Sequence, residues 1–210
     1  MSDKLIRNLT AFLCVDTTET PEFHPHQELE DCILSLKREE DKKSPKDLDN
    51  FLRIAKEARV KRDGARAALE ELSYTYGSEL FSQVPQLKDC ISVSTIKGFS
   101  DGFPTDITAP SSTFGQSIID EFSILHTLLP TFDPSIVNQL EAMYPHIVQA
   151  ILCQYSVIRF AAARCFAGMC KANLVSGIKV LVEGILPVVA DQIELRHRQG
   201  AIECIYRINF

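Results

Sequence analysis

The chain has 210 residues, of which 45% are hydrophobic and 24% are charged, and its formal net charge is −6 at pH 7. These are ordinary values for a globular protein, and Glu183, Gly184 and Pro187 interrupt the longest apolar stretches, which excludes a membrane span of about 20 residues. The acidic balance argues against a broad nucleic-acid-binding surface.

The cysteines indicate a reducing compartment, the cytosol or the nucleus. Their number is odd and no CxxC pair occurs, and several lie in apolar helical patterns where a free thiol behaves as a small hydrophobe. The seven are Cys14, Cys32, Cys90, Cys153, Cys165, Cys170 and Cys204.

Residues 1–46 are expected to form an irregular N-terminal extension, because they contain Pro21, Pro25 and Pro45 and a mixed charge run. Some helix is expected near residues 4–14. Residues 37–62 carry a local charge of +4, which leaves −10 for the rest of the chain. Such a mixed run is typical of a solvated face, although it could also contact an acidic partner.

From residue 47 the apolar residues recur at three- and four-residue steps, which predicts helices. The expected helices are 47–61, 63–76, 78–91, 114–129, 134–153, 156–172, 175–190 and 194–208. Ser78 and Ser156 are candidate N-caps, and Asp133 is a cap before a first-turn proline. Residues 92–113 are rich in Gly, Pro, Ser and Thr and predict a long loop.

One signature occurs three times: an arginine, a small residue two positions later, an alanine next, and a further small residue three positions on. The last two copies lie 39 residues apart, and the first lies 97 residues before the second. Its leading positions are Arg62 with Ala65, Arg159 with Ala162, and Arg198 with Ala201.

A second signature, an apolar residue followed by proline, recurs at Pro85, Pro145 and Pro187. Each proline falls inside a helical pattern and should kink the helix. A kinked helix followed by a helix that opens with arginine and small residues, at a period near 40, is typical of HEAT or armadillo repeats. The fold class predicted is therefore an all-α, HEAT/armadillo-like α-solenoid of three to four helical hairpins over residues 47–210.

The small residues have a physical reason in such an array. Helices pack at about 8–10 Å, depending on the side chains at the contact, and alanine or glycine at the crossing allows close approach. Neighbouring units then share one continuous core. The alternative is an ordinary helical bundle with a chance repeat.

Candidate chemical motifs are weak. The GFSDG motif at 98–102 would make Ser100 a nucleophile only between a strand and a helix, which the flanking sequence does not predict. Asp120 and Glu121 resemble the acidic pair of a nucleotide-hydrolysing strand, but no phosphate-binding loop accompanies them, so exposed helix carboxylates are expected. Cys14, His24, His26 and Cys32 have the ligand types for zinc but fit no common spacing.

We therefore expect no catalytic residue, no cofactor and no metal in this chain. The three recurrent arginines are expected to pair with an acid or a carbonyl of a neighbouring unit. The alternative is that they form a ladder of partner-binding arginines.

The residues around these signatures resemble a known family. The stretch AMYPHIVQAILCQYSVIRFAAARCFAGMCK, followed by GILPVVADQIELRHRQGAIECIYRI, resembles the last HEAT repeats before the motor of the Snf-type ATPases that associate with the TATA-binding protein. VKRDGARAALEELSYTYGSELFSQVPQL, FLCVDTTETPEFH and ILSLKREED are similar to the same family, so the resemblance covers nearly the whole chain in order.

The resemblance implies a nuclear protein whose long HEAT array grips the TATA-binding protein and whose motor uses ATP to remove it from promoter DNA. It implies a C-terminal HEAT-repeat segment, truncated and without the motor, that links partner-binding repeats to that motor. Its neighbours would be other HEAT repeats, the ATPase motor and, through the full-length protein, the TATA-binding protein. It would contact DNA only indirectly and would not bind a membrane. A HEAT adaptor of transport-receptor or phosphatase-scaffold type is the alternative.

Overall fold

The computed structural model describes residues 3–24, 45–100, 112–190 and 194–208, and every regular element in these ranges is a helix. In chain order the α-helices are α1 (Asp3–Leu13), α3 (Pro45–Tyr76), α4 (Leu80–Gln83), α5 (Pro85–Ser100), α6 (Ser112–Leu128), α7 (Pro134–Leu140), α8 (Tyr144–Ile151), α9 (Ser156–Ala172), α10 (Leu174–Val180), α11 (Leu186–Val189) and α12 (Leu195–Arg207). Four short turns join some of these helices. Three are 3₁₀ turns, η2 (Gly77–Glu79), η3 (Leu129–Thr131) and η4 (Glu141–Met143), and one is a π-helical turn, η5 (Leu181–Ile185). The predicted all-α class is confirmed, and no helix in the described ranges is long and apolar enough to cross a membrane.

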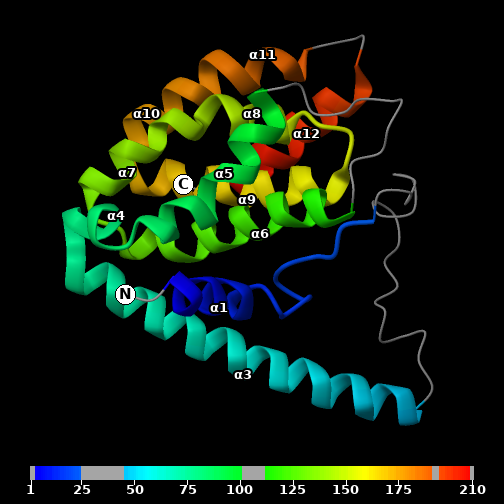
Figure 1. Cartoon of the computed structure of the whole chain (residues 1–210). Helices are drawn as coiled ribbons and strands as arrows, with labels where there is room; N and C mark the ends of the chain where they lie inside the picture. The colour runs from blue at the N-terminus through cyan, green and yellow to red at the C-terminus, as the bar shows by residue number, and fades with distance from the viewer. Residues whose placement is uncertain (1–2, 25–44, 101–111, 191–193, 209–210) are drawn as a thin grey trace.

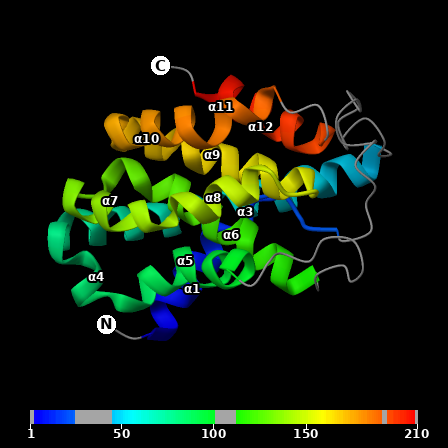
Figure 2. The ribbon, with the colours of Figure 1, turned by 90° about the horizontal axis from the view of Figure 1, so that it is seen from above.

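The helices stack as successive pairs (Figures 1 and 2). α1 packs on α3, α5 on α6, α8 on α9, and α11 on α12. One layer runs through α3, α6, α9 and α12, each contacting the next, and α1, α5 and α8 contact one another in the same order in the other layer. This two-layer stacking is consistent with the predicted α-solenoid. The number of repeats, three to four, stays a prediction.

Helix α9 lies at the centre of the stack and contacts α6, α7, α8, α10 and α12. Ten of its 17 residues are buried, among them Ala161, Ala162, Ala163 and Phe166. A helix surrounded by neighbours must be apolar on nearly every side, and its alanines let those neighbours come near. Tyr144 of α8 meets Phe166 edge-to-face at 5.9 Å between ring centroids.

The small residues of the repeated signature differ in how closely a neighbouring helix approaches them. A Cβ atom placed on Gly200 of α12 would lie 2.0 Å from the carbonyl oxygen of Ile151, so only glycine fits at this crossing. Gly64 of α3, at the equivalent place in the first copy, has open space around it. Ala65, Ala162 and Ala201 are all buried.

Each proline of the second signature lies in the first or second residue of a new helical segment. Val84 leaves helical geometry at φ −132° and ψ 65°, and Pro85 then begins α5. Pro145 follows the 3₁₀ turn η4, and Pro187 follows the π-helical turn η5. Proline has no N–H for the i→i−4 bond and its ring crowds the preceding turn, which explains the interruptions. The helical pattern is thus interrupted at each proline, while the role of these prolines as repeat positions stays a prediction.

Residues 3–24 pack into the same core as the later helices. Ile6 and Leu13 of α1 and Phe23 beyond it are buried members of that core. A Cβ on Gly115 of α6 would lie 2.3 Å from the ring of Phe23, so the glycine leaves room for the aromatic side chain. The helix expected near residues 4–14 is confirmed, whereas the boundary at residue 46 stays a prediction because residues 25–44 lie outside the described ranges.

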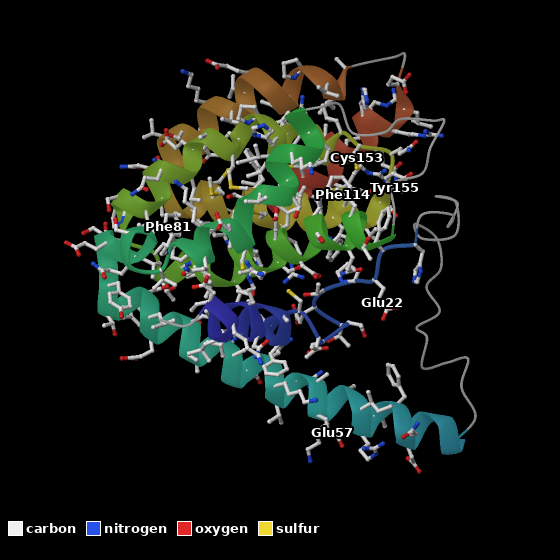
Figure 3. All side chains as sticks on the ribbon, in the orientation of Figure 1. Glu22, Glu57, Phe81, Phe114, Cys153 and Tyr155 are labelled. Atoms are coloured by element: carbon white, nitrogen blue, oxygen red, sulfur yellow. The ribbon has the colours of Figure 1, made fainter. Side chains whose placement is uncertain are left out.

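The predicted helix break at Arg62 is wrong, because α3 runs without interruption from Pro45 to Tyr76. No proline follows Pro45 in this stretch, and an interior glycine costs a helix only about 1 kcal/mol. The helix ends where Gly77 adopts a left-handed φ of 47°. Figure 3 shows Glu57 on the part of α3 that extends past the other helices.

The loop predicted from residue 92 begins no earlier than residue 101, because α5 continues to Ser100. Buried contacts outweigh the unfavourable composition, since Thr95 and Phe99 are buried in this turn of helix. Residues 101–111 lie outside the described ranges.

Of the predicted caps, only one is confirmed. Asp133 accepts a hydrogen bond from the backbone N–H of Ser135 and caps α7. Ser78 lies inside η2, and Ser156 is the first residue of α9, so neither is the N-cap residue of its helix. The cap of α10 is Asn173, whose side chain accepts from the N–H of Ser176.

Candidate functional site

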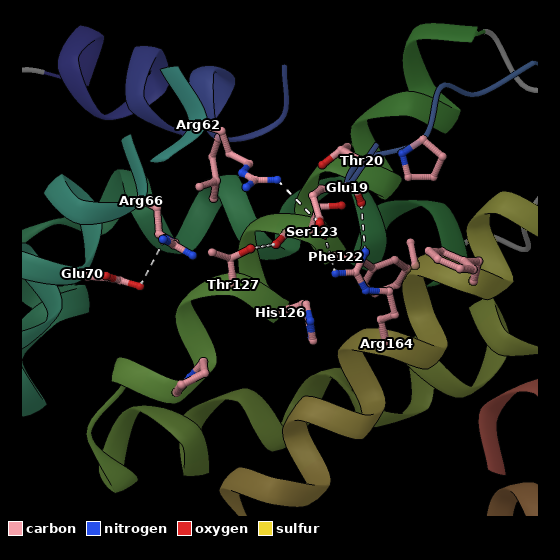
Figure 4. A pocket seen from close by; sticks show the side chains of 15 residues that line it. Glu19, Thr20, Arg62, Arg66, Glu70, Phe122, Ser123, His126, Thr127 and Arg164 are labelled. Carbon is pink, nitrogen blue, oxygen red and sulfur yellow. Dashed lines mark hydrogen bonds and ion pairs between the residues drawn. The ribbon is translucent and has the colours of Figure 1, made fainter. Parts of the chain in front are cut away.

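A cavity of about 370 Å³ lies where α3, α6 and α9 meet the segment that follows α1 (Figure 4). We call it the three-helix cavity. Its lining combines apolar and charged side chains: Leu13, Glu19, Thr20, Pro21, Arg62, Arg66, Glu70, Phe122, Ser123, His126, Thr127, Pro130, Phe160, Ala161 and Arg164. The charged groups come from α3, from α9 and from the segment after α1, so the cavity gathers charges from distant parts of the described chain.

Asp16 anchors this charge network. Its side chain is 2% exposed, and its Oδ2 lies 2.8 Å from Nη1 of Arg62 on α3. Its other oxygen, Oδ1, accepts hydrogen bonds from the backbone N–H of Thr18 at 3.1 Å and from the hydroxyl of Thr18 at 2.6 Å. A buried carboxylate needs such partners, so the turn after α1 and the arginine hold each other in place.

Glu19 extends the network to α9. Both its backbone carbonyl and its carboxylate accept hydrogen bonds from the guanidinium of Arg164, each at 3.0 Å. The same carboxylate lies 3.7 Å from Arg62. Figure 4 shows Arg62 and Arg164 pointing at Glu19 from opposite helices. The segment after α1 therefore connects α3 to α9 through ion pairs with arginines of both helices.

A second anchor holds this segment on α6. The amide of Gln116 accepts a hydrogen bond from the backbone N–H of Phe23 at 2.7 Å and donates one to the carbonyl of Pro21 at 3.3 Å. The ring of Phe23 stacks edge-to-face on Tyr155 at 5.0 Å between centroids. The wall of the cavity is thus fixed to each of the three helices.

His126 of α6 is the only histidine in the lining of this cavity. Burial lowers the pKa of its imidazole, and the nearby positive charge of Arg164 lowers it further. The ring is therefore neutral at pH 7. The hydroxyl residues of the lining are Thr20, Ser123 and Thr127, and the hydroxyl of Thr127 donates to the carbonyl of Ser123 in its own helix. The geometry offers charge pairing and polar recognition, without a nucleophile hydrogen-bonded to a base.

Arg159, the arginine of the second signature copy, has a different environment. Its side chain is fully buried and donates to the carbonyls of Cys153 at 3.2 Å and Gln154 at 3.0 Å. Its Nε lies 3.5 Å from the carboxylate of Glu203 on α12. It thus links the end of α8 to the next helix pair, and being buried it cannot belong to a surface ladder of partner-binding arginines.

The arginines of the other two signature copies do not lie beside Arg159. Arg62 lies in the three-helix cavity, and Arg198 is half-buried in α12 near Gly200. The role of these positions within a repeat stays a prediction.

The expectation that Asp120 and Glu121 are exposed carboxylates is wrong. Glu121 is 5% exposed, and its two oxygens accept from the backbone N–H groups of Ser94 at 2.6 Å and Thr95 at 2.7 Å. Burial raises the pKa of both carboxyls, and their hydrogen bonds lower it in part. Glu121 therefore fastens α6 to α5, whereas the carboxylate of Asp120 accepts a hydrogen bond from Gln116 in its own helix.

The remaining candidate residues form no common site in the described part of the chain. Ser100 is the last residue of α5, and the rest of its motif lies outside the described residues. Cys14 donates its thiol to the carbonyl of Asp120, whereas His24 is exposed beside Glu22. His26 and Cys32 lie outside the described residues, and within those ranges no three metal-ligating side chains converge.

Sequence reasoning missed Asp16, Glu19 and Arg164, the residues that build the charge network. The reason is distance along the chain, because Glu19 and Arg164 are 145 positions apart. Their pairing exists only once the turn after α1 folds over α9.

Comparison with known proteins shows sequence similarity to one group of named proteins over nearly the whole chain. Residues 1–90 match a family model described as a domain of unknown function, DUF3535. The chain is 44% identical, over 98% of its length, to a protein of Aspergillus fumigatus named TATA-binding protein-associated factor mot1, of which it covers 11%. It is 32% identical over 99% of its length to the Schizosaccharomyces pombe protein of the same name, and 30% identical over its whole length to the Saccharomyces cerevisiae one. The chain therefore spans about a tenth of these relatives.

Proposed function

Because this chain is homologous over nearly its whole length to a segment of the TATA-binding protein-associated factors named Mot1, we propose that it is part of a transcription regulator that associates with the TATA-binding protein. Its own part in that regulator is to be a rigid helical spacer. It joins the repeats that hold the partner to the motor that, by family resemblance, uses ATP to remove the TATA-binding protein from promoter DNA. The site of action is the nucleus.

The observation that carries this proposal is the unbroken series of helix contacts from α3 through α6 and α9 to α12. Buried side chains pack this series, and charged links tie parts of it together. Asp16 and Glu19 join α3 to α9, and Arg159 joins the end of α8 to α12. A close-packed interior transmits displacement because it has little room to deform.

The charge network also supports a scaffold role over an enzymatic one. The carboxylates of the three-helix cavity pair with arginines, and His126 is neutral there. Such pairs fix the positions of helices. The proposal assigns any ATP hydrolysis to other parts of the longer protein.

A replacement experiment tests the spacer. This chain would substitute for the matching segment of the Saccharomyces cerevisiae relative, to which it is 30% identical over its whole length. A second version would carry a glycine–serine linker of equal length instead. ATP hydrolysis, binding of the TATA-binding protein and its ATP-dependent release from a promoter duplex would be measured for both.

The chimaera with this chain should release the TATA-binding protein, whereas the linker version should still bind it and hydrolyse ATP without releasing it. Equal release by the linker version would refute a rigid spacer. A pull-down of the TATA-binding protein by this chain alone should be weak, and strong binding would contradict the spacer assignment.

A further inference from the structure

A second cavity, of about 240 Å³, lies between α6, α9 and α12, next to the three-helix cavity. We call it the α9–α12 pocket. It shares His126 and Arg164 with the first cavity and is otherwise separate. Its lining is His126, Arg164, Ala167, Gly168, Lys171, Tyr206 and Arg207.

The α9–α12 pocket is strongly cationic. Arg164, Lys171 and Arg207 line it and no acidic residue does; Glu19 already pairs with Arg164 from the neighbouring cavity, which leaves Lys171 and Arg207 as the charges open to a ligand. The pKa of Arg207 is lowered by burial and then by the nearby charge of Arg164, while Glu203 acts in the opposite direction. Cations placed together in this way repel one another, and an anion between them relieves that repulsion.

Stacking on an aromatic ring orients the guanidinium of Arg207 and does not use its N–H donors. Its central carbon lies 4.1 Å from the centroid of the Phe160 ring, and that of Arg164 lies 5.7 Å from the same ring. Stacking on an aromatic face holds the guanidinium plane and leaves its N–H groups for a planar oxyanion. Lys171, in the last turn of α9, is exposed and adds a further positive charge.

The walls of the pocket are small and partly apolar. Ala167 and Gly168 form part of it, and a Cβ on Gly168 would lie 3.0 Å from a methyl group of Leu129 and 3.3 Å from Nδ1 of His126. Tyr206, next to Arg207 in the chain, is 80% exposed. The space thus suits a single carboxylate with an apolar neighbour along the same chain.

We propose that the α9–α12 pocket binds an acidic side chain of a partner peptide. Arg207 would hold the carboxylate, Lys171 would add charge at the entrance, and Tyr206 would cover the adjoining apolar residue. A peptide fits better than a nucleic acid, because the cations converge on one small cavity while the chain as a whole carries a charge of −6. This role goes beyond that of a spacer.

The test uses the whole chain and fluorescence anisotropy. The probe is a short fluorescein-labelled peptide that repeats glutamate, serine and leucine, with its glutamine counterpart as the uncharged probe. The variant is Lys171→Gln with Arg207→Gln. The matched control is Lys179→Gln with Arg196→Gln, which removes the same charge from exposed positions on α10 and α12.

We expect the glutamate probe to bind and the glutamine probe not to bind. The pocket variant should weaken binding at least about tenfold, since two charge-assisted contacts are lost, and the control should change it less than about twofold. Thermal melting would compare the fold of each protein. Lys171→Glu, a single change at an exposed position, would repeat the test if Arg207→Gln lowers stability.

Other outcomes would overturn the proposal. These are equal binding of the glutamate probe by the pocket variant and the parent, or no binding by the parent at low salt. Binding of a labelled DNA duplex that the pocket variant loses, without peptide binding, would assign the pocket to nucleic acid instead.

Discussion

Replacing Gly200 with alanine should destabilise the chain, although alanine is normally the better helix former. The added Cβ would lie 2.0 Å from the carbonyl oxygen of Ile151 and 3.0 Å from Cδ of Arg159. The arginine stem could rotate, but a backbone oxygen at the end of α8 cannot. Helix α12 would therefore have to move by about 1 Å, and the contact between Arg159 and Glu203 would move with it.

The magnitude follows from two opposing contributions. Overpacking a well-packed contact costs about 1–3 kcal/mol, and a clash with backbone belongs at the upper end of that range. Exchanging glycine for alanine inside a helix returns about 0.5–1 kcal/mol. The net loss is about 2 kcal/mol, which for a chain of this size lowers the Tm by about 4–8 °C.

Gly64→Ala is the matched control, because it makes the same exchange at the equivalent position of the signature, where nothing lies within 4 Å. It should stabilise α3 by about 0.5–1 kcal/mol. Urea unfolding and thermal melting of both variants would measure the difference. The reasoning fails if Gly200→Ala is as stable as Gly64→Ala, since the close approach of α12 to α8 would then not exist.

The other predictions concern single side chains. Ala162→Leu should cost about 1–3 kcal/mol in urea unfolding, because Ala162 is fully buried in the central helix; a parent-like melt would contradict close packing there. Asp16→Asn should cost about 1–3 kcal/mol by removing the charge that Arg62 faces at 2.8 Å, an effect to be checked by a double-mutant cycle with Arg62→Gln. Glu121→Ala should cost about 1–3 kcal/mol, because two backbone N–H groups of α5 lose their acceptor; amide exchange at those two positions should accelerate. Finally, the pKa of His126 is lowered in the folded state, so the folded chain binds fewer protons and stability should fall as the pH drops below about 6.5. His126→Gln should reduce that dependence between pH 7 and pH 5, and an unchanged profile would argue against its burial.

Features that depend on neighbouring residues could be predicted from the sequence. Pro85, Pro145 and Pro187 interrupt helices wherever they occur, because the missing N–H is a property of the residue itself. Asp133 before a proline caps α7 for an equally local reason. The repeated signature likewise indicated an all-α stack, since its spacing places small residues where helices cross.

Features that depend on distant contacts could not be predicted in this way. Residues 92–100 look like a loop by composition, yet they form helix because Phe99 is buried and Glu121 accepts two N–H groups from this turn. The three-helix cavity depends on Glu19 meeting Arg164 from the far end of the chain. No local pattern marks either partner, so such pairs become visible only in the folded chain.

The buried charges explain how the stack keeps a defined geometry. Apolar packing is nondirectional, and small residues set how near two helices lie without setting how far one slides along the other. A buried charge is different, because displacing it from its partner costs about 3–5 kcal/mol. Arg159 is among the largest fully buried side chains, and it is tied to two carbonyls on one side and to Glu203 on the other. Asp16 fixes the turn after α1 against α3 by the same principle. We infer that small residues set the spacing of this array and buried ions set its register, and a spacer between a partner-binding region and a motor requires both.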